Sequence, residues 1–283
     1  MMKRKIDLYL HSWKRDSNRK PLIVRGARQV GKTYSVRQFG KTYQSFVEIN
    51  FVTHPEFKGI FTQGFSVDTV IRQISFFNPA FQFIENDTLI FFDEIQEFTD
   101  CVTCLKFFLE DHRFDVICSG SMMGLNYKEI TSNSVGYKSD YTMYSLDFEE
   151  FLWAKGYKNE QIDELFRHLS TLTPFSSIEM NAMNGLFLEY AVVGGMPAIV
   201  SHFIETGTYA GIVEMQQQLL FDYEEDITKY AQGLDKAKIK NVYHHIPFFL
   251  AKETKNSKLQ KWPPMLVVAN MWVVWNGLLT RAL

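Results

Sequence analysis

The sequence has few cysteines and no signature of a secreted protein. Of its 283 residues three are cysteine, Cys101, Cys104 and Cys118, so a disulfide framework is excluded as the basis of the fold. Cys101 and Cys104 form a C-x-x-C pair without a second ligand pair nearby, and we interpret them as two thiols one helical turn apart. The N-terminus lacks the apolar segment of a signal peptide. We therefore expect a reducing, cytoplasmic location.

The sequence also lacks a large excess of either positive or negative charge, and it lacks long apolar runs. The formal net charge is -2, which gives no global basic excess for nucleic-acid binding. The first twenty residues are locally basic, which we interpret as a solvated helix face, with a contact patch as the alternative. No stretch has the length of a confident membrane span, so we expect no membrane association. Hydrophobic residues make up 46% of the chain, enough for a sizeable core.

Short apolar segments alternate with segments of helical periodicity from Pro21 to about Gly156. Strands are expected at 21–24, 45–51, 88–94, 115–121 and 141–146, with helices between them. The segment 88–94 is apolar almost throughout, as parallel strands buried on both faces are. The pattern predicts an α/β fold with a parallel sheet and flanking helices in residues 1–157. A mainly helical region is expected over 158–245.

A phosphate-binding motif follows the first expected strand. The residues Gly26, Ala27, Arg28, Gln29, Val30, Gly31, Lys32 and Thr33 match G-x-x-x-x-G-K-[ST]. Glycines let the backbone wrap so that N–H groups face phosphate oxygens, and the following helix adds its positive N-terminal end. Lys32 would reach the β- and γ-phosphates, and the Thr33 hydroxyl would ligate Mg²⁺. The motif in this context predicts a P-loop NTPase fold with ATP and Mg²⁺ as cofactors.

Acidic and hydroxyl side chains end two later strands. Asp93 and Glu94 follow an apolar strand about 60 residues after the loop. Asp93 would hold Mg²⁺ through water, and Glu94 would orient and polarise the attacking water. Ser119 and Ser121 end the next strand, where a hydroxyl can contact the γ-phosphate or the lytic water. Periodicity does not decide which of the two serines points toward the site.

A hydrolase of this kind needs a cation near the γ-phosphate, and no residue is an obvious choice. Arg28 lies in the loop, while Arg113 and Lys138 lie near later strand ends. We interpret each as a surface charge. The cation could come from another subunit, which would make a homo-oligomer necessary for turnover.

The motifs together resemble one family. The segments "KPLIVRGARQVGKT", "TLIFFDEIQ", "DVICSGSMMG", "YSLDFEEFLWAKG", "GGMPAIV" and "IPFFLAKE" are similar to those of prokaryotic AAA-type ATPases with a C-terminal domain of unknown function. The resemblance covers roughly residues 3–261 and implies ATP binding and hydrolysis in the cytoplasm. It also implies that 246–261 begin a winged-helix-like domain, which suggests a nucleic-acid or protein partner. By its residues alone, Gly194–Pro197 is a tight turn between helices.

The resemblance stops at Lys261, where a Trp- and Val-rich segment over 262–283 begins. When the reading frame is shifted back by one nucleotide, permissive codon choices give an amphipathic, helix-like string that resembles how the family continues. We therefore predict that 262–283 are an out-of-frame tail of a truncated copy. Resequencing the gene across the Lys261 codon in independent isolates tests this prediction, and an unbroken frame through Leu283 would reject it.

The sequence supports two main hypotheses for the function and a weaker third one. The first is a Mg²⁺-dependent ATPase in which Lys32, Ser119, Ser121 and Glu94 take part in catalysis. The second is a nucleotide-gated switch with little turnover that recruits a protein or a nucleic acid through its helical region. A phosphotransferase is weaker, because no acceptor pocket can be identified and Glu94 favours water as the nucleophile.

Overall fold

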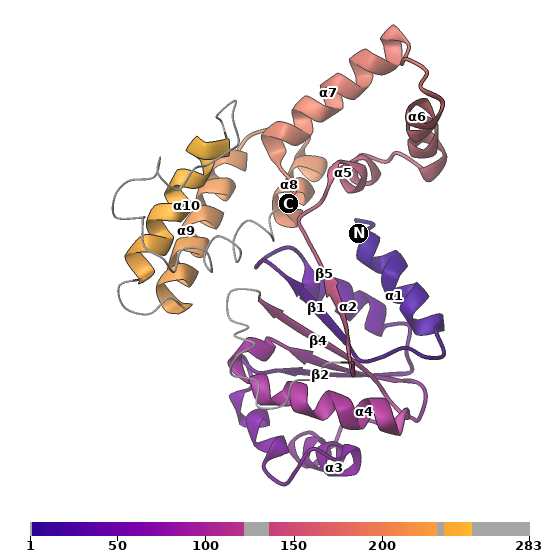
Figure 1. Cartoon of the computed structure of the whole chain (residues 1–283), viewed down its shortest axis with the longest axis vertical. Coiled ribbons are helices and arrows are strands. Elements are labelled where there is room, and N and C mark those ends of the chain that lie inside the picture. Colours follow the sequence, from indigo (N-terminus) through magenta and orange to yellow (C-terminus); the bar gives the residue numbers. More distant parts are fainter. Residues whose placement is uncertain (1, 122–135, 231–234, 251–283) are drawn as a thin grey trace. The chain divides into compact units, whose positions relative to one another are not determined.

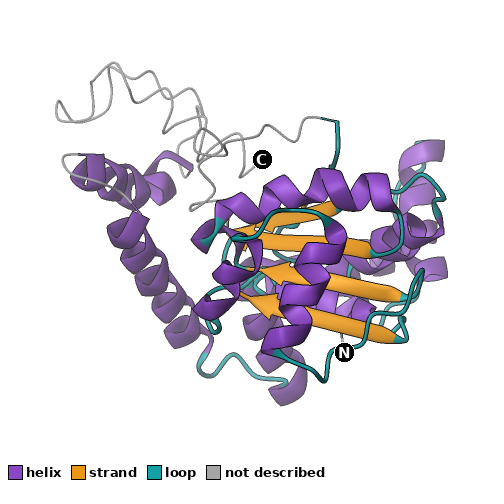
Figure 2. Ribbon diagram, turned by 90° about the horizontal axis from the view of Figure 1, so that it is seen from below, coloured by secondary structure: helices purple, strands orange, loops and turns teal. Residues whose placement is uncertain are grey.

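The computed structural model describes residues 2–121, 136–230 and 235–250, and its first part is built on a five-stranded sheet (Figure 1). All neighbouring strands are parallel, in the order β2-β3-β4-β1-β5. The strands are β1 (Leu22–Gly26), β2 (Ser45–Asn50), β3 (Thr88–Asp93), β4 (Asp115–Ser121) and β5 (Ser139–Thr142). Their carboxyl ends share one edge, as the arrowheads in Figure 2 show. β4 separates β1 from β3, so the phosphate-loop strand and the acidic strand are not neighbours.

Helices cover both faces of the sheet, as the sequence predicts. α1 (Lys5–Arg15) and α2 (Lys32–Gly40) pack on one face, and α3 (Val67–Phe77) and α4 (Leu105–Asp111) pack on the other (Figure 1). Side chains of β3 alternate between these two cores, with Leu89 and Phe91 in the first and Ile90 and Phe92 in the second. Because both faces are buried, β3 is apolar at successive positions rather than at every second one. Ser66 caps α3 by accepting a hydrogen bond from the Thr69 N–H.

One local prediction was wrong. The fifth strand is Ser139–Thr142 and not Tyr141–Leu146, because the apolar residues of that segment serve two separate cores. Met143 is buried with the sheet, whereas Leu146 is buried among the helices that follow. Cys101 and Cys104 lie one helical turn apart, as predicted, in a 3₁₀ helix, Thr99–Cys104, that comes directly before α4. Burial raises the pKa of both thiols, which keeps them protonated and unreactive.

The region after the sheet is helical in its described parts. α5 (Phe148–Ala154), α6 (Asn159–Thr171), α7 (Ser177–Val193) and α8 (Pro197–Thr206) follow β5. α9 (Ile212–Tyr230) and α10 (Asp235–Leu250) come next. None of the helices within the described ranges is long and apolar enough to span a bilayer.

Contacts divide the chain into two compact units, Met1–Met215 and Gln216–Leu283. The boundary expected near residue 157 stays a prediction, and the one expected between 245 and 246 falls inside α10. The segment 262–283 lies outside the described residues, as do residues 251–261.

Candidate functional site

The predicted phosphate loop connects β1 to α2 at the carboxyl edge of the sheet. Gly26 ends β1, and α2 begins at Lys32. Between them Gln29 and Gly31 adopt left-handed backbone conformations, with φ of 63° and 98°. A Cβ atom on Gly26 would lie 2.2 Å from the Met143 carbonyl oxygen, so only glycine fits there. The residues 26–33 therefore form the strand–loop–helix arrangement that an anion-binding loop requires.

Lys32 folds back onto this loop. Its Nζ donates hydrogen bonds to the carbonyl oxygens of Gly26, at 3.1 Å, and Ala27, at 2.7 Å. The residue is only 8% exposed. Burial lowers the pKa of the Lys32 ammonium, and the negative charges of Glu94 and Asp93 offset only part of this effect. A polyphosphate at the loop would supply the counter-charge that favours the protonated form.

The Asp93 carboxylate accepts hydrogen bonds from several elements of the site. It accepts hydrogen bonds from the Thr33 hydroxyl, 3.0 Å from Oδ2, from the Asn50 amide, at 3.0 Å, and from the Ser119 hydroxyl. The backbone N–H of Glu94 donates another, at 3.0 Å. Burial raises the pKa of Asp93, and the hydrogen bonds from Ser119 and Thr33 counteract the shift. Residues of α2, β2 and β4 thus converge on the end of β3.

Glu94 follows Asp93 in a left-handed conformation, with φ of 57° and ψ of 45°. Such a conformation is uncommon outside glycine and occurs often at functional sites. Its carboxylate accepts a hydrogen bond from the Gln96 side-chain amide. The Gln96 side-chain oxygen, Oε1, in turn accepts a hydrogen bond from the backbone N–H of Ser121, at 3.1 Å. Gln96 therefore connects Glu94 to the end of β4.

The two serines of β4 have different surroundings. The sequence periodicity did not decide which of them points toward the site. Ser119 binds Asp93 through its hydroxyl. Ser121 is also buried, but its hydroxyl has no hydrogen-bond partner in the described part of the chain.

Asn50 and Gln96 were not among the predicted site residues. Asn50 pairs in register with Asp93 across β2 and β3. The sequence feature that could have identified Asn50 is a polar residue at the end of a strand. Gln96 lies in a 3₁₀ turn whose direction the sequence pattern does not reveal.

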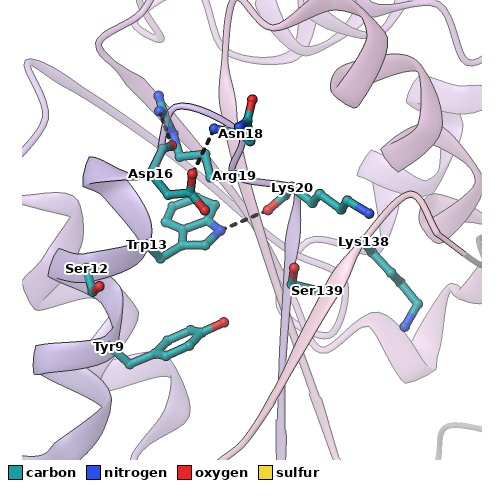
Figure 3. Close-up of a pocket in the computed structure, with 9 residues that line it drawn as sticks. All are labelled: Tyr9, Ser12, Trp13, Asp16, Asn18, Arg19, Lys20, Lys138 and Ser139. Atoms are coloured by element: carbon teal, nitrogen blue, oxygen red, sulfur yellow. Dashed lines mark hydrogen bonds between the residues drawn. The ribbon is translucent and has the colours of Figure 1, made fainter.

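Of the three candidate cations, two lie away from the site. Arg113 lies two residues before β4 and Lys138 directly before β5, at the opposite edge of the sheet. Arg113 pairs with Asp111 and Asp68, and Lys138 pairs with Asp140. Lys138 borders a polar cavity of about 370 Å³ at that edge, where the Trp13 ring N–H donates to the Lys20 carbonyl (Figure 3).

The third cation and the turn between α7 and α8 are close to the phosphate loop. Arg28 is a loop residue, and its charge contributes to the lowered pKa of Lys32. The Gly195 carbonyl oxygen accepts the Leu146 N–H, at 2.6 Å. A Cβ built on Gly31 would lie 3.8 Å from Pro197. The predicted tight turn is present, and it packs beside the phosphate loop.

Comparison with known proteins agrees with this geometry. Residues 18–152 match a family model described as an AAA domain. The N-terminal part of this chain is an AAA domain. Residues 184–270 match a domain of unknown function (DUF8612), so this match includes the first residues of the segment 262–283. No curated protein matches the sequence.

Among solved structures, the Walker-type ATPase PABY2304 of Pyrococcus abyssi is 13% identical with a TM-score of 0.43, over 88% of this chain and 78% of that one. PCH-2 of C. elegans is 15% identical with a TM-score of 0.40, over 70% and 60% respectively. AMPPCP-bound DnaA from Aquifex aeolicus is 10% identical with a TM-score of 0.40, over 89% and 79%.

Proposed function

We propose that this AAA domain binds ATP together with Mg²⁺ and hydrolyses it. The observation that carries the proposal is the convergence on Asp93, where a threonine of the phosphate loop and a serine of β4 share one buried carboxylate. Lys32 and the N-terminus of α2 lie next to Thr33 in the chain and supply positive charge for a triphosphate.

The donor set of Thr33 and Asp93 suits magnesium. Both groups offer oxygen atoms, the ligands that Mg²⁺ prefers, and Mg²⁺ in nucleotide sites uses one or two carboxylates and keeps several waters. The buried carboxylate carries a raised pKa and lacks a cation among its direct hydrogen-bond partners in the described structure. When bound, the ion would neutralise charge on the phosphate oxygens.

We assign distinct roles to the surrounding side chains. Lys32 leaves the loop carbonyls and donates to phosphate oxygens. Glu94 accepts a hydrogen bond from the attacking water and takes its proton, because it is the carboxylate next to Asp93 that no backbone amide already occupies in the described structure. Ser119 keeps Asp93 oriented, and the Ser121 hydroxyl is available to the γ-phosphate or the water.

Phosphate release by the purified chain, with Mg²⁺ and ATP, tests the proposal. Glu94→Gln should bind ATP with unchanged affinity and lose turnover by a factor of about 10²–10⁴, since a general base contributes that much. Glu110→Gln is the matched control, because Glu110 is an exposed residue of α4 that forms an ion pair with Lys106 at 3.9 Å and lies outside the candidate site. Equal, slow phosphate release by wild type and Glu94→Gln would reject hydrolysis.

One observation favours the nucleotide-gated switch as a second candidate. The Gln96 amide donates to one oxygen of the Glu94 carboxylate, so in this conformation an attacking water would share that carboxylate with Gln96. In the switch, ATP binding alone changes the affinity for a protein or nucleic-acid partner that contacts the helical region. We further infer a cytoplasmic protein and a homo-oligomer in which a neighbouring subunit supplies a cation near the γ-phosphate.

A further inference from the structure

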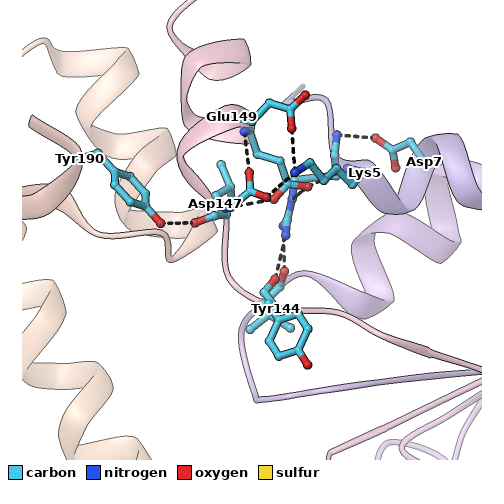
Figure 4. A network of polar contacts seen from close by, with 10 residues as sticks. Lys5, Asp7, Tyr144, Asp147, Glu149 and Tyr190 are labelled. Carbon is cyan, nitrogen blue, oxygen red and sulfur yellow. Dashed lines mark hydrogen bonds and ion pairs between the residues drawn. The ribbon is translucent and has the colours of Figure 1, made fainter. Parts of the chain in front are cut away.

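Arg4 is a buried cation directly before α1, and it touches the phosphate loop from a distant part of the chain. The residue is 7% exposed. One terminal nitrogen, Nη1, donates to the Val30 carbonyl oxygen at 3.0 Å, and the other, Nη2, donates to the Tyr144 carbonyl oxygen at 2.8 Å. The Nε atom lies 3.0 Å from a carboxylate oxygen of Glu150 in α5. Figure 4 shows this polar network around Tyr144 and Asp147.

The contact with Val30 bears on the orientation of a phosphate-binding amide. In a trans peptide the carbonyl and the N–H of the next residue point in opposite directions. Arg4 holds the Val30 carbonyl on one side of the loop, and the Gly31 N–H is thereby directed to the other. Gly31 has no Cβ and a φ of 98°, so its own backbone does little to restrain that plane. The guanidinium of Arg4 therefore restrains the orientation of the Val30–Gly31 peptide plane, which the glycine backbone alone restrains little.

Arg4 is itself held by α5. One Glu150 oxygen pairs with Arg4 and also accepts the Lys5 N–H at 2.6 Å. The other accepts the Asp147 N–H at 3.3 Å, as part of the capping box that begins α5. The guanidinium thus contacts the carbonyl oxygens of Val30 and Tyr144 and the carboxylate of Glu150, and Val30 belongs to the phosphate loop.

We propose that Arg4 is a positioning residue that orients the Gly31 N–H toward the bound phosphates. The proposal rests on the proposed ATP binding. Arg4 does not touch the nucleotide; it acts through the Val30–Gly31 peptide.

The test compares two variants that share one substitution. Glu150→Gln retains the carbonyl contacts of Arg4 and, since glutamine also fits a capping box, the start of α5. Arg4→Met/Glu150→Gln additionally removes the guanidinium and leaves no unpaired buried charge, which avoids the main cause of unfolding expected for Arg4→Met alone. ATP dissociation constants and melting temperatures are measured for both. Lys5→Met is the control, because its ammonium pairs with Asp147 and Glu149 and not with the phosphate loop in the described part of the chain.

We expect Glu150→Gln and Lys5→Met to bind ATP within about twofold of wild type and the double variant to bind about tenfold more weakly. Equal affinity of the double variant and Glu150→Gln overturns the role of Arg4 while leaving ATP binding intact. If the double variant does not fold, Arg4→Lys replaces it, since one ammonium cannot span both carbonyls and the carboxylate; about threefold weaker binding is expected, and unchanged binding overturns the role. Absence of ATP binding by wild type overturns the proposed function and this role together.

Discussion

The hydroxyl of Ser119 on β4 donates a hydrogen bond to the carboxylate of Asp93 at the end of β3. The contact exists because β4 lies between the phosphate-loop strand and the acidic strand. The hydroxyl of Ser121, two residues further along β4, has no hydrogen-bond partner among the described residues. Two serines two positions apart thus have separable roles.

Ser119→Ala and Ser121→Ala should therefore differ. Loss of the Ser119 hydrogen bond removes an effect that lowers the pKa of Asp93, so that pKa rises further. We expect the free energy of unfolding to fall by about 1.5–3 kcal/mol, the range for hydrogen bonds to charged groups. Ser121→Ala should change it by no more than about 0.5 kcal/mol, because its hydroxyl makes no such bond. Urea unfolding measures both, and equal losses would show that the two hydroxyls are equivalent.

Asp93→Asn should stabilise the nucleotide-free protein while it abolishes magnesium-dependent turnover. Because the pKa of Asp93 is raised, the native state holds its proton more tightly than the unfolded chain does. The ionisation of Asp93 therefore lowers the free energy of unfolding as pH rises from the pKa of an unfolded aspartate to the raised pKa of the native state. Above the raised pKa the full loss of stability is present. At neutral pH we expect a gain of about 1 kcal/mol, or roughly 2–4 °C in melting temperature.

The pH dependence provides the check on that prediction. The difference in stability between Asp93→Asn and wild type should shrink as pH falls through the raised pKa of Asp93. A lower melting temperature for Asp93→Asn at neutral pH would mean that the hydrogen bonds to the carboxylate outweigh its burial.

Gly26→Ala should destabilise the phosphate loop. The new Cβ would lie 2.2 Å from the Met143 carbonyl oxygen, and backbone would have to move. We expect a loss of about 1–3 kcal/mol in the free energy of unfolding, as for other overpacked positions. Gly185→Ala in α7 is the matched control: nothing lies within 4 Å of its added Cβ, and it should gain roughly 0.5–1 kcal/mol. Similar stability of Gly26→Ala and wild type would contradict the close approach.

The sequence was sufficient to locate the first four strands and the phosphate loop, because local patterns determine them. The buried run before Asp93 and the turn chemistry of residues 26–33 need no knowledge of distant contacts. The fifth strand was misplaced, since nothing local reveals that Met143 and Leu146 join different cores. Arg4 was interpreted as part of a solvated face, whereas it is buried through partners at Val30, Tyr144 and Glu150 that are far away in sequence.

Calorimetric titration of ATP into the protein, with and without Mg²⁺, tests the central claim most directly. Wild type should bind ATP, more tightly with the metal. Lys32→Met should bind about 10–100-fold more weakly, because charge-assisted hydrogen bonds to phosphate are lost. Lys41→Met, which removes an exposed lysine that donates to the Gln38 side chain, should bind as wild type does. Absence of ATP binding by wild type, or equal affinities for wild type and Lys32→Met, would contradict a nucleotide site at this loop.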